Sequence, residues 1–335
     1  MPLEAALTPG AARLPQAWRA PLVQLALAAL GLVALFFGEW SEMARQWWYS
    51  STYNHILLIP PILAWLVWLR APALAKLVPQ AWWPGFALFA AGLLTWFAGT
   101  AVGVNLVSQF GAVVLLQAAV VTLLGPRVAA GLLFPLGYML FLVPFGDEIV
   151  PMLQAITAKL AVALTHASGI PATVDGVFID TPAGLFEVAE ACSGVKFLVA
   201  MVALGSLAAH LGFKGWKRRA VFMAAAVIVP VLANGVRAWG TIFVAQSQGV
   251  EFALGFDHIV YGWIFFAVVM GLLLAGAWRF FDRAPDDPLI DAAALEASPL
   301  LAGLASFRVG GWAALAALLL AAGAAVAMDR IAALP

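Results

Sequence analysis

A cysteine, an arginine and a histidine stand beside or within long apolar runs, where reactive side chains are uncommon. Cys192, in the string EACSGVKF, is the only cysteine of the chain, and Arg237 and His258 follow in LANGVRAWG and GFDHIVYGWIFF. A thiol beside an imidazole can attack a carbonyl, and a fixed guanidinium can hold a carboxylate or an oxyanion. If the fold brings the three together, their side chains predict acyl-transfer chemistry.

Two further residues favour this interpretation through their spacing. Lys196 follows Cys192 by one helical turn, and the cysteine stands where a helix would begin, so both the lysine and the helix dipole favour a thiolate. Asn234 precedes Arg237 by three residues and shares its helix face. The alternative roles are a small buried apolar side chain for Cys192, an arginine that reaches lipid headgroups, and an ordinary interfacial histidine at His258.

Three more polar residues are candidates for supporting roles. Glu190 lies on the approach to the cysteine, Asp257 directly precedes His258, and His55 begins an early apolar run. Glu190 could orient a basic group, although an exposed strand would explain it equally well. We expect His55 to line the same region as the cysteine.

The amino-acid composition indicates whether the exterior of the protein faces water or lipid. The 335 residues are 64% hydrophobic and only 10% charged, and the mean hydropathy is +0.99. Soluble domains carry roughly 25% charged residues, so much of this exterior must face lipid. The formal net charge of +0 gives no basic footprint for nucleic acid. A single cysteine excludes a disulfide framework and a Cys-rich zinc site, and we expect neither a cofactor nor a metal.

The apolar runs predict an all-α polytopic membrane protein with about eight or nine transmembrane helices. The first run lacks a small-residue cleavage site, so we expect a retained helix and not a cleaved signal peptide. The run at 55–69 is short and contains Pro60 and Pro61. The expected spans are 21–38, 55–69, 82–100, 105–124, 127–145, 193–211, 219–244, 258–281 and 309–328.

Lysine and arginine placement predicts the orientation. With the N-terminus in the cytoplasm, most of these residues fall inside, including the cluster at 214–219. The stretch from Arg219 to Arg237 rises roughly 27 Å at about 1.5 Å per residue, which carries Arg237 to the outer boundary. Cys192 and His258 are expected at the same depth, since each opens a helix from the outer side.

The segment at 146–192 is expected to lie outside the membrane. Residues 149–167 have apolar side chains at helical spacing with Gln154, Thr157, Lys159 and His166 interspersed, which predicts an amphipathic surface helix. The strings ATVDGVFID, TPAG and LFEVAEA then alternate around a turn. They predict a small β-hairpin that leads to the cysteine.

The ordered motifs resemble the exosortase family. EACSG, then NGVR, then a histidine that opens the next helix match the family pattern, and STYNHILLIPP and GIPATVDGVFIDTPAG resemble exosortase A-type members. The resemblance covers roughly residues 20–283. It implies that Cys192, Arg237 and His258 are the catalytic residues, with the cysteine as nucleophile.

The resemblance also implies a function and a location. Exosortases are regarded as sortase analogues that cleave the C-terminal PEP-CTERM signal of exported proteins and are linked to exopolysaccharide production. The expected partners are PEP-CTERM proteins as substrates, membrane lipid, and an unknown acceptor, which could be linked to lipid or polysaccharide. The expected location is the bacterial inner membrane, with the active site on the periplasmic side.

The domain organisation follows from these boundaries. We expect a cytoplasmic tail at 1–20, an exosortase-like transmembrane domain at 21–283, and an acidic cytoplasmic loop with one additional helix at 284–335. Two alternatives come from other functional classes. A transporter or non-catalytic polysaccharide-export component would also place polar residues within helices, and an intramembrane acyltransferase would use a histidine without a thiol.

Overall fold

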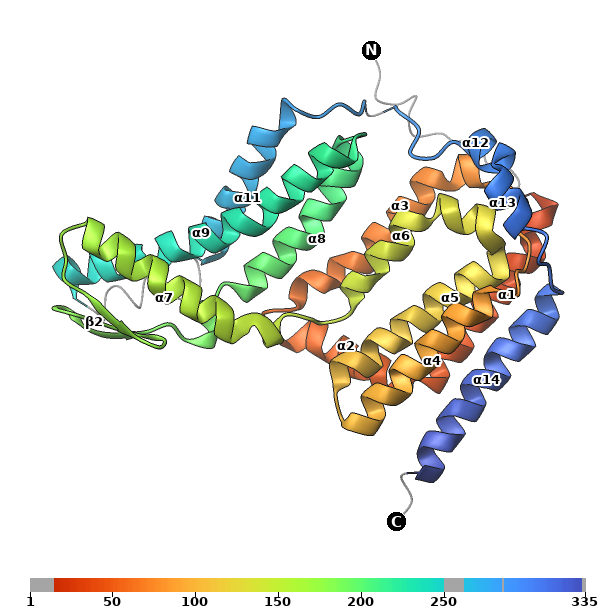
Figure 1. Cartoon of the computed structure of the whole chain (residues 1–335), viewed down its shortest axis with the longest axis horizontal. Helices are drawn as coiled ribbons and strands as arrows, with labels where there is room; N and C mark the ends of the chain where they lie inside the picture. Colours follow the sequence, from red (N-terminus) through yellow and green to blue (C-terminus); the bar gives the residue numbers. More distant parts are fainter. Residues whose placement is uncertain (1–14, 250–261, 285, 333–335) are drawn as a thin grey trace. The chain divides into compact units, whose positions relative to one another are not determined.

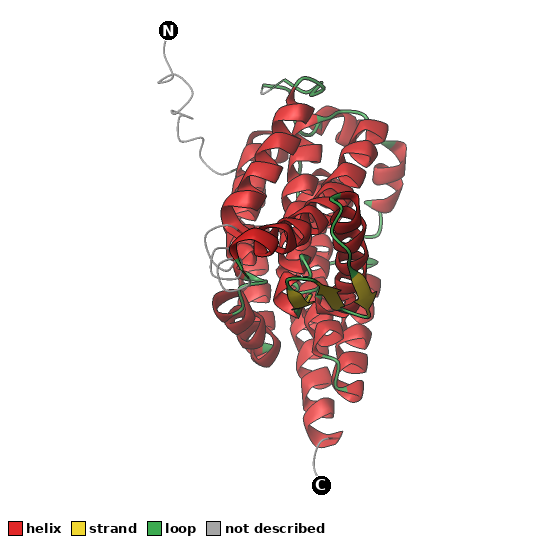
Figure 2. Cartoon of the chain, turned by 90° about the vertical axis from the view of Figure 1, so that its left-hand side faces the viewer, coloured by secondary structure: helices red, strands yellow, loops and turns green. Residues whose placement is uncertain are grey.

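The computed structural model describes residues 15–249, 262–284 and 286–332. Most of them are helical, and the strands form one small sheet (Figure 2). The protein is an all-α polytopic membrane protein. Eight helices in the described part of the chain are long and apolar enough to span a membrane: Gln16–Leu35, Asn54–Leu74, Gly85–Val102, Asn105–Gly131, Asp147–Ala167, Glu190–Gly212, Trp216–Gln248 and Gly311–Ala332.

Two expected elements differ in the structure. The run at 127–145 is not one span, because helix α5 (Asn105–Gly131), which kinks at Gly125 with φ 80 and ψ 175, continues from Pro126 into this run and ends at Gly131. Proline has no amide hydrogen for the preceding turn, and glycine tolerates the positive φ. The apolar helix that follows, Leu133–Leu142, is short. Conversely, the expected surface helix is α7 (Val150–Ala167), which lies within a segment long and apolar enough to span.

The chain forms two compact units. The first comprises the described residues within Met1–Trp47, Ile56–Pro144 and Pro288–Pro335. The second comprises those within Trp48–His55 and Phe145–Asp287. The helices that belong wholly to the first unit are α1 (Gln16–Leu35), α3 (Ile59–Leu74), α4 (Gly85–Val102), α5, α6 (Leu133–Tyr138), α12 (Ala292–Ala297), α13 (Pro299–Leu304) and α14 (Gly311–Ala332), while α2 (Phe37–Tyr49) begins in it.

Small residues let the helices of the first unit approach closely. Figure 1 shows α4 and α5 running side by side as a hairpin, and the two pack extensively. A Cβ on Gly111 of α5 would lie 2.5 Å from the backbone nitrogen of Trp96 in α4. Helix α14 packs against α1, where Leu32 and Leu318 are fully buried. In lipid, burial of apolar side chains between helices gives little free energy. Helix association there depends on van der Waals packing, which close backbone approach at glycine improves.

The second unit is organised around one long helix. Helix α9 (Trp216–Gln248) packs against α7 and against α8 (Val195–Gly212), and α11 (Gly262–Trp278) also contacts α9. Asp282 and Asp287, which follow α11, pair with Arg218 at 2.9 Å and with Lys214 at 2.6 Å. The hydrogen bond from Lys214 holds the pKa of Asp287 below its ordinary value. Part of the basic cluster is therefore paired within the chain.

The expected hairpin is part of a three-stranded antiparallel sheet. Strands β1 (Thr173–Asp175), β2 (Phe178–Thr181) and β3 (Gly184–Glu187) follow in order. Ile179 pairs with Phe186, and both are buried. Because side chains alternate along a strand, this pair fixes which face of the sheet covers the helices.

Replacement of Gly111 by Ala tests the close α4–α5 contact. The added methyl group would overlap backbone atoms of Trp96, so we expect a destabilisation of about 1–3 kcal/mol, seen as a lower midpoint of thermal unfolding in detergent. Gly323→Ala in α14 is the matched control, because nothing lies within 4 Å of its added Cβ. Equal unfolding midpoints for the two variants would contradict this packing.

Candidate active site

Cys192 sits on a tight turn immediately before α8. It ends a 3-10 helix, Glu190–Cys192, and its amide donates to the carbonyl of Ala189 at 2.8 Å. Gly194 then adopts a left-handed φ of +87 and serves as the N-cap of α8. Glycine takes this conformation without steric cost, so the local sequence ACSG directs the sharp change of direction. The cysteine is partly exposed.

Asn234 of α9 fixes this turn from the other side. Its side-chain nitrogen donates to the carbonyl oxygen of Cys192 and to the hydroxyl oxygen of Thr157 in α7, each at 2.9 Å. Asn234 is 2% exposed, and a Cβ on Gly194 would lie 2.8 Å from its Cγ. A buried amide that makes two hydrogen bonds is costly to displace. One side chain therefore holds together α7, α9 and the turn that bears the cysteine.

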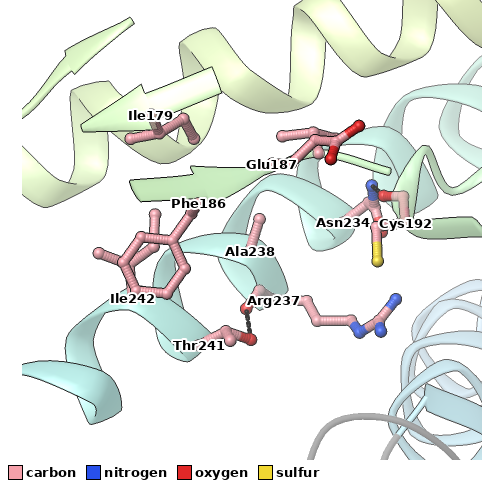
Figure 3. Close-up of a pocket in the computed structure, with 10 residues that line it drawn as sticks. Ile179, Phe186, Glu187, Cys192, Asn234, Arg237, Ala238, Thr241 and Ile242 are labelled. Carbon is pink, nitrogen blue, oxygen red and sulfur yellow. Dashed lines mark hydrogen bonds between the residues drawn. The ribbon is translucent and has the colours of Figure 1, made fainter. Parts of the chain in front are cut away.

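A small cavity of about 70 Å³ lies beside the thiol. At roughly 10–15 Å³ per water molecule, it has room for about five waters. Figure 3 shows the sulfur of Cys192 pointing toward the side on which the Arg237 side chain extends. The lining residues are Ile179, Phe186, Glu187, Val188, Cys192, Asn234, Arg237, Ala238, Thr241 and Ile242.

Positive charge gathers around the sulfur. The Lys196 ammonium lies within electrostatic range of both the Cys192 thiol and the Arg237 guanidinium. The same ammonium lies 5.0 Å from the ring centroid of Phe197. Cations in a site of low dielectric stabilise an anionic sulfur or a developing oxyanion. The electrostatics of the site therefore suit nucleophilic attack by a thiolate.

The structure brings together only some of the residues expected from sequence. Cys192, Arg237 and Asn234 line one cavity, with Lys196 near the first two. Glu190 is exposed and is not among the lining residues, whereas Glu187 is. The Glu187 carboxylate points away from the guanidinium (Figure 3).

Neither expected histidine is among the described residues that line the cavity. The Nδ1 atom of His55 lies 3.0 Å from the carbonyl oxygen of Thr52, and the ring does not line the cavity. Its buried Nε2 atom has no hydrogen-bond partner in the described part of the chain. His258 and Asp257 lie outside the described residues. Their role in the site stays a prediction from the motif.

Two residues of α7 contribute although they were expected on a water-facing surface. Thr157 is 1% exposed and accepts the Asn234 hydrogen bond. Gln154 donates to the carbonyl of Val188 at 2.7 Å, which holds the strand segment next to the cavity. Their separation of about one helical turn was the available signal, because it places both on one face. Sequence alone did not show that this face is covered by α9 and the sheet.

Replacement of Asn234 by Leu tests the link to the cysteine turn. Leucine has a similar size but cannot donate, so the Cys192 carbonyl loses its partner and we expect about 1–3 kcal/mol of destabilisation. The thermal unfolding midpoint in detergent is the measurement. Thr157→Ser is the control, because it keeps the hydroxyl oxygen that accepts from Asn234. An Asn234→Leu midpoint no lower than that of the control would show that these hydrogen bonds contribute little.

Comparison with known proteins adds a family to this geometry. A family model described as transmembrane exosortase (Exosortase_EpsH) matches residues 47–275. That range includes Cys192, Arg237 and all of the cavity lining. Neither the curated proteins nor the solved structures gave a match. The match covers well over half of the 335 residues, and the chain belongs to the transmembrane exosortase family.

Proposed function

We propose that the protein is a membrane-embedded cysteine protease or transpeptidase that cleaves the PEP-CTERM sorting signal of exported proteins. This cleavage takes place at the periplasmic face of the bacterial inner membrane and contributes to exopolysaccharide production. One observation carries the proposal: the only thiol of the chain and the Arg237 guanidinium share a small cavity. Family membership supports the substrate class.

The first half-reaction transfers an acyl group to sulfur. The Cys192 thiolate attacks the carbonyl carbon of the scissile peptide bond and forms a tetrahedral intermediate. The carbon–nitrogen bond then breaks, and the leaving amine takes a proton from His258. A thioester on the sulfur and a released C-terminal fragment result. In the second half, His258 removes a proton from water or from an acceptor, whose attack regenerates the thiolate.

Arg237 and Lys196 stabilise charge in this scheme. Arg237 binds the oxyanion of the tetrahedral intermediate, and Lys196 supports the thiolate from the first turn of α8. Asn234 acts through Cys192 by holding its carbonyl, so it is a positioning residue. The role given to His258 rests on the motif order. Asp257 adjoins that histidine in the sequence and would orient it.

The apolar part of the cavity supports a peptide substrate. Ile179, Phe186 and Ile242 line it, and their side chains gather on one side of Arg237 (Figure 3). A side chain next to the scissile bond would bury its surface there, at about 25 cal/mol per Å².

Replacement of Cys192 by Ala tests the nucleophile. We expect uncleaved substrate to accumulate in the membrane while the thermal unfolding midpoint stays close to that of the unmodified protein. Cys192→Ser should also be severely impaired, because a hydroxyl needs stronger activation by a base. Immunoblots of a sorted protein report processing, and mass spectrometry of the trapped thioester identifies the attacking atom. Continued processing in Cys192→Ala would overturn the assignment and favour a transport or export role.

Replacement of Arg237 by Gln tests the oxyanion role. Removal of an oxyanion donor lowers kcat by about 10²–10³-fold in known enzymes, and we expect a loss of that order in the rate of processing. Arg237→Lys should recover part of the rate, since it keeps the charge. Arg279→Gln on the exposed end of the same unit is the control and should process normally. Unchanged processing in Arg237→Gln would remove the arginine from the mechanism.

A further inference from the structure

A second cavity lies in the first unit, far from this chemistry in the sequence. It occupies about 270 Å³ where α2 begins, α4 ends and α5 begins. All of its lining residues belong to the first unit. The distribution of lysine and arginine predicts that this end of the helices faces outward. Figure 1 shows α2 beside the ends of α4 and α5 that the short loop connects.

Every residue with a side chain that lines this cavity carries an oxygen atom able to accept a hydrogen bond or ligate a cation. Glu39 and Glu42 contribute carboxylates from α2, and Asn105 and Gln109 contribute amides from α5. Hydroxyls come from Thr100 and Ser108, and the other lining residues are glycines. No lysine, arginine, histidine or aromatic side chain is among the lining residues. Hard cations such as calcium select this set of donors.

Gln109 supplies an independent sign of a ligand. Gln109 is 2% exposed, and its side chain makes no hydrogen bond within the described part of the chain. Nevertheless it lines the cavity. Its amide atoms are not among the fully enclosed polar atoms that lack a partner, so they reach the open space of the cavity, where water or a ligand satisfies them. The amide oxygen of Gln109 is therefore available to whatever occupies the cavity.

The local charge determines the sign of that ligand. Arg45 pairs with Glu42 at 2.8 Å and is 67% exposed on its side chain. Glu39 accepts a hydrogen bond from the Trp96 indole at 2.6 Å through one oxygen, and that donor is neutral. One carboxylate charge therefore remains without a cationic partner of its own in the described part of the chain. Gln109 and the hydroxyls add partial negative charge on their oxygens.

We propose that this cavity binds a hydrated divalent cation, with calcium favoured over magnesium. Glu39 and Gln109 ligate it directly, and the volume leaves room for several ordered waters. The described residues hold no group of three or more His, Cys, Asp or Glu side chains, so neutral oxygens and water complete the shell. Calcium accepts such flexible, mixed shells, whereas magnesium requires near-ideal octahedral geometry.

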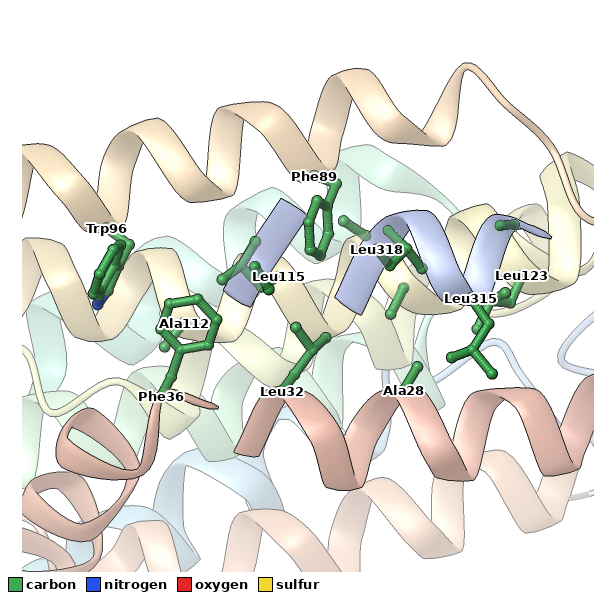
Figure 4. Close-up of a cluster of buried hydrophobic side chains, with 14 of the residues drawn as sticks. Ala28, Leu32, Phe36, Phe89, Trp96, Ala112, Leu115, Leu123, Leu315 and Leu318 are labelled. Carbon is green, nitrogen blue, oxygen red and sulfur yellow. The ribbon is translucent and has the colours of Figure 1, made fainter. Parts of the chain in front are cut away.

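The cation would join the start of α2 to the α4–α5 hairpin. Figure 4 shows Phe36 and Trp96 at this end of the buried core of the first unit, and their rings meet edge to face at 4.9 Å. Glu39 and Trp96 are already linked by the indole hydrogen bond. A cation held by Glu39 of α2 and Gln109 of α5 would add a third connection. Proteins in extracellular compartments bind calcium at about 10⁻⁴–10⁻³ M, which suits a stabilising site.

Calcium binding by the purified full-length protein in detergent tests the proposal. After chelation and dialysis, calorimetric titration with calcium chloride should give a dissociation constant in the range of about 10⁻⁴–10⁻³ M. The thermal unfolding midpoint should rise with calcium and fall again on chelation. Magnesium chloride at the same concentration should raise it less.

Two variants and a control make the test specific. Glu39→Gln keeps an acceptor for Trp96 but removes the charge, so it should weaken calcium binding roughly tenfold or more. Gln109→Leu should also abolish the calcium-dependent rise. Glu296→Gln, at an exposed carboxylate of α12, should bind calcium normally. Absence of calcium binding in the unmodified protein, or equal binding in all three variants, would overturn the proposal.

Discussion

The position of Cys192 depends on two hydrogen bonds from one buried amide. Asn234 donates to the Cys192 carbonyl and to Thr157, so α9 holds both the cysteine turn and α7. Arg237 stands about one turn further along the same helix. Because an α-helix is stiff over one turn, α9 fixes the Arg237 backbone relative to Asn234 and so relative to the cysteine turn that Asn234 holds.

Glycine residues and buried polar side chains allow close packing between segments in both units. Gly111 lets α4 and α5 approach in the first unit, and Gly194 lets the cysteine turn approach Asn234 in the second. In lipid, helices gain little from burying apolar side chains against each other, so close contact and hydrogen bonds must contribute. The same logic explains why an asparagine lies buried in α9.

The two cavities carry opposite charge, and each is proposed to bind or stabilise a group of the opposite sign. Arg237 lines the first, with Lys196 nearby, which suits an anionic sulfur and a developing oxyanion. Glu39 and Glu42 line the second, which suits a cation. One cavity is proposed for chemistry, where stabilisation must increase in the transition state. The other is proposed to stabilise the folded state, where a bound ion needs only to favour that state.

The sequence by itself determined the membrane class, the family motifs and the expectation that Cys192 and Arg237 lie at one depth. The composition shows that much of the exterior must face lipid. The rise per residue of a helix shows how far apart two residues lie along the membrane normal. The break at Gly125 falls between the expected runs at 105–124 and 127–145, but the second run was wrongly expected to be one span, because an apolar run does not show where a helix ends inside it. The catalytic role of His258 remains a prediction from the motif.

Only the tertiary structure decided which faces meet. It placed Thr157 inward under Asn234 and put Glu187, not Glu190, at the cavity. It also brought Glu39 and Gln109, which are far apart in the chain, to one cavity. Periodicity shows that a helix has a distinct face but not which neighbour covers it. That choice arises from packing between distant segments, which no local pattern of residues specifies.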